Sequence, residues 1–378
     1  MALNLICDGN WAAHMDFGAI AKGGKDPLSS LSAQTQLAKG MAARIFSVAE
    51  TLPVSNIIIC VDSKSWRKEF FPGYKSKRAT AKGAMDDETK KLFYNVIEDF
   101  CNAAKNKGVI ISRVPGAEGD DLLWAWSRHL NNKGENCLIM SGDRDTVQLV
   151  YDGKLGNEPE KGWTVVWTNS WKNQTFFVPK GWKGVQEDVF DMSASNDVTS
   201  VTSLSKDLFA TVTEMPDPSS IVFSKILLGD DGDDVPAVWV DGKKRLTPSK
   251  AQIVLEYVQK KGYTLNDWPK LRSNEPLLLD LCGTILRTMS AIDGTNERAA
   301  VLENLYRNEK LVYLDSSSLP PNLLRSIDRH MEESPLEAEH LRNPSLWKRN
   351  GILKGSRFEH VDAAPRTMDP FAFVDLPI

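Results

Sequence analysis

Apolar runs alternate with amphipathic segments through residues 1–150 of the chain. The apolar runs predict strands at residues 3–7, 56–61, 109–114 and 136–140. Apolar residues recur at helical spacing between them, which predicts helices at residues 34–50, 88–107 and 120–131. Strands that alternate with helices are typical of an α/β fold, so we expect a central, mainly parallel sheet covered by helices.

The pattern changes in the second half of the chain. Residues 162–168 and 175–178 predict a β-hairpin, and the polar stretch 193–207 predicts a mobile loop. Further elements are expected as helices at residues 219–228, 248–261 and 276–292 and as a strand at residues 310–314. These changes predict a first domain at residues 1–222, a helical region at 223–330 and a weakly structured extension at 331–378.

Composition excludes some classes of function and leaves others open. A chain of 378 residues with 42% apolar residues can build two or three domains, and its net charge of −4 does not indicate a nucleic-acid partner. The cysteines lack metal-ligand spacing and are expected to be reduced: Cys7, Cys60, Cys101, Cys137 and Cys282. With no signal peptide or membrane-length apolar run, a cytoplasmic protein is expected.

Acidic residues follow each of the predicted strands. Asp8, Asp62, the stretch Glu118-Gly119-Asp120-Asp121, and the pair Asp143 and Asp145 stand at or just after strand ends. The carboxyl ends of parallel strands are where α/β sheets bind ligands. A single aspartate there is ordinarily a turn or capping residue, but acids at successive strand ends are hard to explain by capping alone.

Carboxylates without accompanying histidine or cysteine suit a hard divalent cation, with Mg²⁺ as the default and zinc disfavoured. The full set of candidate ligands is Asp8, Asp62, Glu118, Asp120, Asp121, Asp143, Asp145, Asp230 and Asp233. So many acids indicate two or more ions, and such a site suits in-line phosphodiester hydrolysis. The alternative is a set of helix caps with a solvated acidic face.

A local basic segment offsets the acidic balance of the chain. Residues 64–82 hold seven cations and one acid, interleaved with aromatic residues. Cations beside aromatic rings suit a nucleic-acid strand, whose phosphates they pair and whose bases they stack. Without the acids nearby in the sequence, the simpler interpretation would be a solvated basic loop.

Six stretches, in order, resemble the motifs of the 5′-nuclease family of flap endonucleases and 5′→3′ exonucleases. They are Asp8–Asn10, Val61–Asp62, Trp66–Arg78, Glu118–Asp121, Gly142–Leu149 and Gly229–Pro236. Residues 307–315 also resemble the closing strand of that family, so the resemblance covers about residues 3–320. Its details look most like the phage RNase H/flap endonucleases that remove primers.

The resemblance implies a PIN-like nuclease domain with a basic arch at about residues 64–90, followed by a helix-three-turn-helix (H3TH) DNA-binding region. It implies a first metal ion held by Asp8, Asp62, Glu118, Asp120 and Asp143. It implies a second ion held by Asp145, Asp230 and Asp233, with Asp121 between the ions or outside them. Asp143 is therefore expected to be essential for catalysis.

The resemblance also implies roles for the basic segment. Tyr74, Lys75 and Arg78 match the arch, where Lys75 would neutralise the scissile phosphate and Arg78 would bind or polarise it. Arg67 would add a phosphate contact. The family usually has arginine where this chain has His14, which implies either a weaker, pH-dependent phosphate contact or a buried, satisfied histidine.

A second departure follows Pro236. The family's glycine-rich hairpin, which binds duplex phosphates and often potassium, is absent here, and this puts a potassium site in doubt. Four cations are expected to grip the duplex by their side chains instead: Lys243, Lys244, Arg245 and Lys250.

The sequence therefore predicts a monomeric, Mg²⁺-dependent, structure-specific 5′-nuclease, with Mn²⁺ able to substitute. Expected substrates are branched or nicked duplex DNA and RNA–DNA hybrid, in the host cytoplasm if the protein is phage-encoded. One alternative is a PIN-type ribonuclease for single-stranded RNA, which does not need Gly229–Pro236. Another is a non-catalytic DNA-junction binder, whose expected mark is lost acids. Residues 368–378 would either dock on a replication clamp or single-strand-binding protein, or pack on the body.

Overall fold

The computed structural model describes residues 3–22, 26–52, 54–79, 85–153, 162–170, 173–179, 211–215, 219–263, 268–334, 336 and 351–360. They form two compact units. Unit 1 comprises Met1–Lys64, Met85–Met215 and Asn322–Ile378, and unit 2 comprises Ser65–Ala84 and Pro216–Pro321. All of the basic segment after Lys64 thus belongs to the helical unit rather than to the sheet unit, and the last part of the chain belongs to unit 1.

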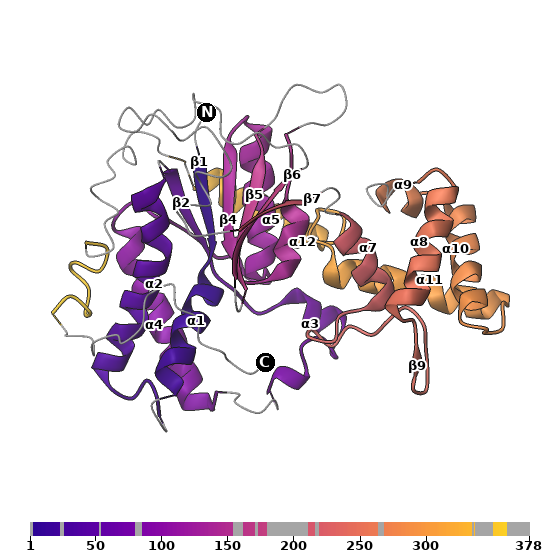
Figure 1. Ribbon diagram of the computed structural model, residues 1–378. Coiled ribbons are helices and arrows are strands. Elements are labelled where there is room, and N and C mark those ends of the chain that lie inside the picture. Colours follow the sequence, from indigo (N-terminus) through magenta and orange to yellow (C-terminus); the bar gives the residue numbers. More distant parts are fainter. Residues whose placement is uncertain are drawn as a thin grey trace. The chain divides into compact units, whose positions relative to one another are not determined.

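A sheet of seven strands forms the centre of unit 1, in the order β3-β2-β1-β4-β5-β6-β7 (Figure 1). The strands are β1 Leu3–Asp8, β2 Val54–Cys60, β3 Ile110–Ser112, β4 Asn136–Ser141, β5 Thr164–Ser170, β6 Asn173–Pro179 and β7 Thr211–Met215. The first five run parallel, and β6 pairs with β5 antiparallel. The chain moves from β1 to β2 and β3 and then returns to β4 on the other side of β1, which makes β1 and β4 the topological switch point.

Helices cover both faces of this sheet (Figure 1). On one face lie α1 Gly9–Ala21, α2 Leu31–Thr51 and α4 Asp87–Lys105, whose apolar residues share a core with Leu5 and Ile59. The helix α5 Gly119–Asn132 contacts β1, β2 and β4, and the alternate residues Ile6 and Ile58 are buried outside that first core. Burial on both faces explains why β1 and β2 are apolar along most of their length rather than at alternate positions.

Unit 2 is mostly helical. Its elements are α3 Trp66–Phe70, α7 Ser219–Leu228, α8 Pro248–Lys260, α9 Trp268–Arg272, α10 Glu275–Thr288, α11 Thr295–Val312 and a small hairpin of β8 Val240–Asp241 and β9 Lys244–Arg245. Ile226, Val254, Leu281, Ile285 and Leu305 are fully buried in its core. Each such side chain stabilises the fold by about 1.5–3 kcal/mol relative to an exposed one.

The predicted α/β fold is confirmed, including the early strands and helices and the β5–β6 hairpin. The predicted strand at residues 310–314 is wrong, because residues 310–312 end helix α11. Val301, Leu305, Asn308 and Val312 are buried at helical spacing along one face of α11. Leu311 and Val312, which suggested a strand, belong to the buried face of this helix. The predicted loop at residues 193–207 lies outside the described residues.

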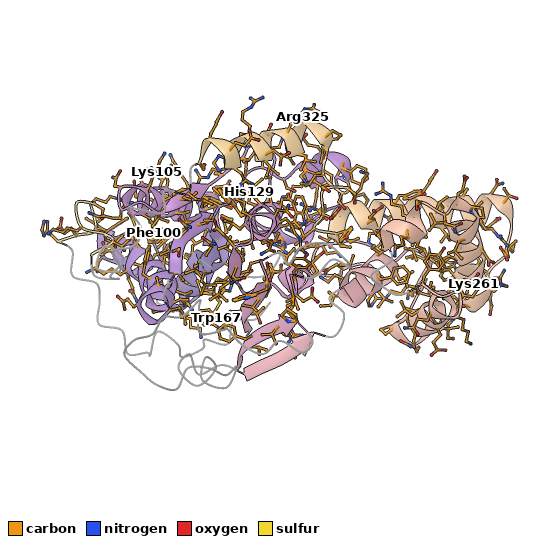
Figure 2. The ribbon with its side chains drawn as sticks, turned by 90° about the horizontal axis from the view of Figure 1, so that it is seen from above. Phe100, Lys105, His129, Trp167, Lys261 and Arg325 are labelled. Atoms are coloured by element: carbon orange, nitrogen blue, oxygen red, sulfur yellow. The ribbon has the colours of Figure 1, made fainter. Side chains whose placement is uncertain are left out.

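The weakly structured extension expected at residues 331–378 stays a prediction: of its described residues, 331–333 end a helix and 351–360 form turns. Helix α12, Pro321–Glu333, buries Leu323, Ile327 and Met331, which stand four residues apart, while Arg325 lies on its outward face (Figure 2). Further on, the buried Ile352 and Phe358 pack in the core of unit 1. Residues 361–378, including the proposed docking tail, lie outside the described part. No helix among the described residues is long and apolar enough to cross a membrane.

We expect Phe358→Ala to lower the free energy of unfolding by about 3–5 kcal/mol, because it leaves a cavity in the core of unit 1. Urea unfolding of the full chain, followed by tryptophan fluorescence, measures this change. The side chain of His360 is 89% exposed, so His360→Ala serves as the matched control and should change stability by less than about 0.5 kcal/mol. Equal effects of the two substitutions would contradict the packing described for residues 351–360.

Candidate metal centre

The carboxyl ends of the parallel strands bring the first acids to one edge of the sheet. Asp8 ends β1 and pairs in register with Cys60, which ends β2 two residues before Asp62. Ser141 ends β4 on the other side of β1, two residues before Asp143. The acids therefore converge on the switch point of the sheet, the place where such folds bind ligands.

Asp8 is the half-buried centre of this group. Its Oδ1 accepts a hydrogen bond from the Trp11 amide at 2.9 Å and so caps helix α1, and its Oδ2 accepts one from Ser141 Oγ at 3.2 Å. Loss of hydration and then the negative charge of Asp62 raise the pKa of Asp8 to about 7, and Asp143 adds to this effect. The two hydrogen bonds oppose the rise without cancelling it.

Asp62 is held at the amino end of α5. Its Oδ1 accepts a hydrogen bond from the Gly119 amide at 2.6 Å. A Cβ atom at Gly119 would stand 3.1 Å from Asp62 Oδ1 and 3.8 Å from Asp8 Oδ1. The missing side chain at Gly119 therefore lets two carboxylates approach the positive end of the helix dipole, which favours negative charge.

The stretch Glu118–Asp121 begins helix α5. Asp121 is buried, and its Oδ2 accepts a hydrogen bond from the Glu118 amide at 3.1 Å. This contact gives Asp121 a capping role at the helix start. Asp120 is half-buried, and together with Asp8 and Asp62 its charge adds to the burial that raises the pKa of the Cys60 thiol. Asp120 thus belongs to the same electrostatic group.

Asp143 and Asp145 start the short 3-10 helix Arg144–Leu149 after β4. Asp143 Oδ1 accepts a hydrogen bond from the Asp145 amide at 2.8 Å, and Ser141 Oγ accepts one from the Asp143 amide at 3.1 Å. Between them, a Cβ atom at Gly142 would stand 1.9 Å from Trp11 Nε1, so only glycine fits this turn. Ser141 thereby links the turn to Asp8.

The donor chemistry of this edge fits a hydrated divalent cation. Among the described residues, no three acid, histidine or cysteine side chains stand close enough to hold one ion by themselves. Mg²⁺ needs only one or two direct carboxylates and keeps several waters. A cation beside Asp8 and Asp62 would also offset the repulsion that raises the pKa of Asp8.

Asp230 and Asp233 belong to unit 2, in the turn that follows α7. Burial favours the neutral form of Asp230, but the contact with Lys225 at 2.5 Å and hydrogen bonds from the Gly232 and Asp233 amides together outweigh burial and lower the pKa of Asp230. Gly229 has a φ of +73°, and a Cβ atom there would stand 2.2 Å from the Val235 carbonyl, so the turn requires glycine. The sharing of one ion by Asp145, Asp230 and Asp233 stays a prediction.

The residues of the basic segment face Asp233 within unit 2. The hydroxyl of the buried Tyr74 donates to Asp233 Oδ2 at 3.0 Å, and Lys75 Nζ lies 3.7 Å from the same oxygen. Arg78 pairs with Asp233 Oδ1. Arg67 is buried and donates from Nε to the Leu311 carbonyl at 3.1 Å. The phosphate-binding roles of these residues stay predictions.

Other predicted residues lie on exposed surfaces. Lys243 and Lys244 stand on the exposed β8–β9 hairpin beside Arg245, which bonds Asp231 Oδ1 at 2.8 Å and Oδ2 at 3.0 Å. Lys250 is half-buried near the start of α8. His14 is exposed with its ring 4.7 Å from that of Phe93, so the alternative of a buried histidine is wrong.

Sequence reasoning did not identify Ser141, Asn10 or Asp234, which take part in the contacts around these acids. Asn10 Oδ1 accepts a hydrogen bond from the Asp62 amide at 2.9 Å and fixes the end of β2. Both Asn10 and Ser141 stand within two residues of a predicted ligand, and that proximity was the signal available. Asp234 lies in a stretch of four aspartates, and nothing in the sequence separates it from Asp230, Asp231 and Asp233.

The first part of the chain is similar to a known family. Residues 3–175 match the family described as the 5′-3′ exonuclease N-terminal resolvase-like domain. The 5′-3′ exonuclease of Buchnera aphidicola subsp. Acyrthosiphon pisum is 32% identical over 99 residues, which cover 26% of this chain and 32% of that protein. DNA polymerase I of Mycobacterium tuberculosis (strain H37Rv) is 26% identical over 160 residues, 42% of this chain and 17% of that protein. The chain spans a third or less of these relatives.

Solved structures show the same fold. The bacteriophage T5 flap endonuclease, in a pseudo-enzyme–product complex with DNA and metal ions, matches with a TM-score of 0.50 and 16% identity over 89% of this chain and 99% of that one. The T5 5′-exonuclease with bound zinc matches with a TM-score of 0.50 and 15% identity over 90% and 100%. Residues 3–175 are thus similar to the 5′-3′ exonuclease family, and the fold of the chain is that of the T5 flap endonuclease.

We expect the free energy of unfolding, measured in EDTA, to fall as the pH rises from about 4 to about 7. Asp8 keeps its proton in the folded state up to about pH 7, whereas the unfolded chain releases it near the ordinary pKa of 3.8. Asp62→Asn removes a neighbouring negative charge and should make this fall shallower. Urea unfolding of both proteins at pH 5 and pH 7 measures the difference. An equal fall in the variant would show that Asp62 does not act on Asp8.

Proposed function

We propose that this protein is a Mg²⁺-dependent, structure-specific 5′-nuclease that cuts 5′ flaps and degrades 5′ ends by phosphodiester hydrolysis. The observation that carries the proposal is the convergence of Asp8, Asp62 and Asp143 at the switch point of a PIN-like sheet. These acids lie within residues 3–175, the part of the chain that matches the 5′-3′ exonuclease family.

The acids at the sheet edge would hold the divalent ions, with Asp8 and Asp62 as direct ligands and Asp120 and Asp143 completing the site through water. The bound ions supply an activated water and stabilise the charge that develops on the phosphate. The chain supplies the geometry: Ser141 orients Asp8, and the Gly119 amide orients Asp62. Two ions and Mg²⁺ as the natural metal are part of the proposal.

The substrate would be branched or nicked duplex DNA, or an RNA primer paired with DNA. The T5 flap endonuclease, which has a similar fold, was solved in complex with DNA. Unit 2 of this chain carries exposed cations suited to phosphates. Lys75 and Arg78 would meet the scissile phosphate, and the exposed Lys243 and Lys244 would hold the duplex. These side chains would replace the glycine-rich hairpin that the chain lacks.

With Mg²⁺, the purified protein should cleave a 5′-flap substrate, and Asp143→Asn should abolish cleavage while duplex binding changes little. The amide leaves the fold of the turn intact but removes the charge that an ion requires. Gel assays on flap, nicked and RNA-primed duplexes, with filter binding, measure both properties. Glu98→Gln, at an exposed acid paired with Arg113, is the matched control and should cleave normally.

Failure of the wild type to cut any of these substrates with Mg²⁺ or Mn²⁺ would overturn the proposal. Faster cutting of single-stranded RNA than of flap DNA would favour the PIN-type ribonuclease instead. Specific binding of a junction without cleavage would favour the non-catalytic alternative.

The double variant Lys243→Ala with Lys244→Ala should bind duplex DNA more weakly, and the loss should be similar for every sequence. The slope of log K against log salt should become shallower by about 2, because each phosphate contact releases about one counterion. Fluorescence anisotropy at KCl concentrations between about 50 and 200 mM measures the binding constant and hence this slope. Lys105 and Lys107 lie in unit 1, and their double alanine variant should keep the wild-type slope. An unchanged slope in the Lys243 and Lys244 variant would show that the β8–β9 hairpin does not contact the duplex.

A further inference from the structure

Two segments far apart in the sequence interlock within unit 2. Residues 74–78 of the basic segment lie against the acidic turn, defined as residues 230–235. The Lys75 amide donates to the Asp233 carbonyl at 2.9 Å, and the Lys77 amide donates to Asp234 Oδ2 at 2.8 Å. Main-chain groups of the basic segment are therefore held by the turn, in addition to its charged side chains.

Backbone conformation supports a tightly defined contact. Lys75 has a φ of +53° and Asp234 a φ of +58°, although neither is glycine. Each left-handed residue costs about 1–2 kcal/mol, and such strain persists only where the surrounding contacts over-determine it. Both strained residues lie where residues 74–78 contact residues 230–235. The backbone conformation of each segment therefore depends on the hydrogen bonds between them.

Asp233 and Asp234 make different kinds of contact with the basic segment. The Asp233 carboxylate contacts the side chains of Tyr74, Lys75 and Arg78, and these contacts would change if that carboxylate bound an ion. The Asp234 carboxylate accepts from the main-chain amide of Lys77 and, at 3.4 Å, from Ser76 Oγ. It also lies 2.5 Å from Lys77 Nζ, and its own side chain is only 8% exposed. The Asp234 contacts do not pass through Asp233.

We propose that Asp234 is a positioning residue that anchors the basic segment to the acidic turn, so that Lys75 and Arg78 are presented to the substrate phosphate from a fixed backbone. The inference rests on the proposed function, since it names a further residue for that reaction. Asp234 neither binds substrate nor holds an ion in this scheme. It acts through the backbone at Lys77, and it leaves the Asp233 side chain able to exchange Tyr74, Lys75 and Arg78 for an ion.

The test compares two substitutions that respect the left-handed backbone. Asp234→Gly keeps the positive φ without strain but removes the acceptor for the Lys77 amide. Asp234→Asn keeps an acceptor oxygen and tolerates the same φ. A misplacement of about 1 Å can cost about 100-fold in rate, so we expect Asp234→Gly to slow single-turnover flap cleavage by about 10- to 100-fold. The Kd for the substrate should change by less than about threefold, and Asp234→Asn should cleave within about threefold of the wild type.

A control variant and a hydrogen-exchange comparison separate a local effect at Asp234 from a general loss of structure in unit 2. Asp293→Asn disrupts the ion pair with Arg298 elsewhere in unit 2 and should cleave normally. Hydrogen exchange of the peptide covering residues 74–79 should be faster in Asp234→Gly than in Asp234→Asn or the wild type, in the free protein and with Mg²⁺.

Normal single-turnover cleavage by Asp234→Gly would overturn the inference, as would an Asn variant as slow as the Gly variant, or unchanged exchange in residues 74–79. If the wild type cleaves no flap, the proposed function itself fails. The exchange comparison then still decides whether Asp234 anchors the segment, so the two failures are distinguishable.

Discussion

Unit 1 has to hold carboxylates together against their mutual repulsion. Asp8 shows the cost most directly, because loss of hydration and the charge of Asp62 raise its pKa to about 7. The parallel register of β1 with β2 and β4 brings these acids to one edge of the sheet despite their repulsion. The buried apolar residues of the strands stabilise that register. Ordinary core packing thus provides the free energy that keeps the acids in place despite their charge.

Main-chain amides orient three of the acids. The amide of Gly119 meets Asp62, that of Trp11 meets Asp8, and that of Asp145 meets Asp143. Amide donors at helix starts are fixed by secondary structure, so each carboxylate is oriented before any ligand arrives. Asp121 differs because its Oδ2 accepts from the Glu118 amide at the start of its own helix, and its place around an ion stays a prediction.

The sheet and the acids at its edge could be predicted from the sequence because their signals are local: apolar runs of strand length, each followed by an acid. The strand expected at residues 310–314 failed for the same reason. A short apolar run is ambiguous between a strand and the last turn of a helix, and the stripe from Val301 to Val312 decides for the helix. The packing of Phe358 and the contact between Lys77 and Asp234 join residues far apart in sequence, and a single sequence carries no signal for such pairs.

The interlock of residues 74–78 with residues 230–235 has a consequence for how this chain can diverge. The chain leaves unit 1 after residue 64, returns at 85, and leaves it again after residue 215. A recombination event that exchanged everything before residue 215 would bring in a new basic segment opposite the old acidic turn. The strained backbones at Lys75 and Asp234 fit one another closely, so a substitution in one segment would require a matching change in the other. The two segments are therefore expected to evolve together although more than 150 residues separate them. Exchange between relatives should therefore succeed only when both segments travel together.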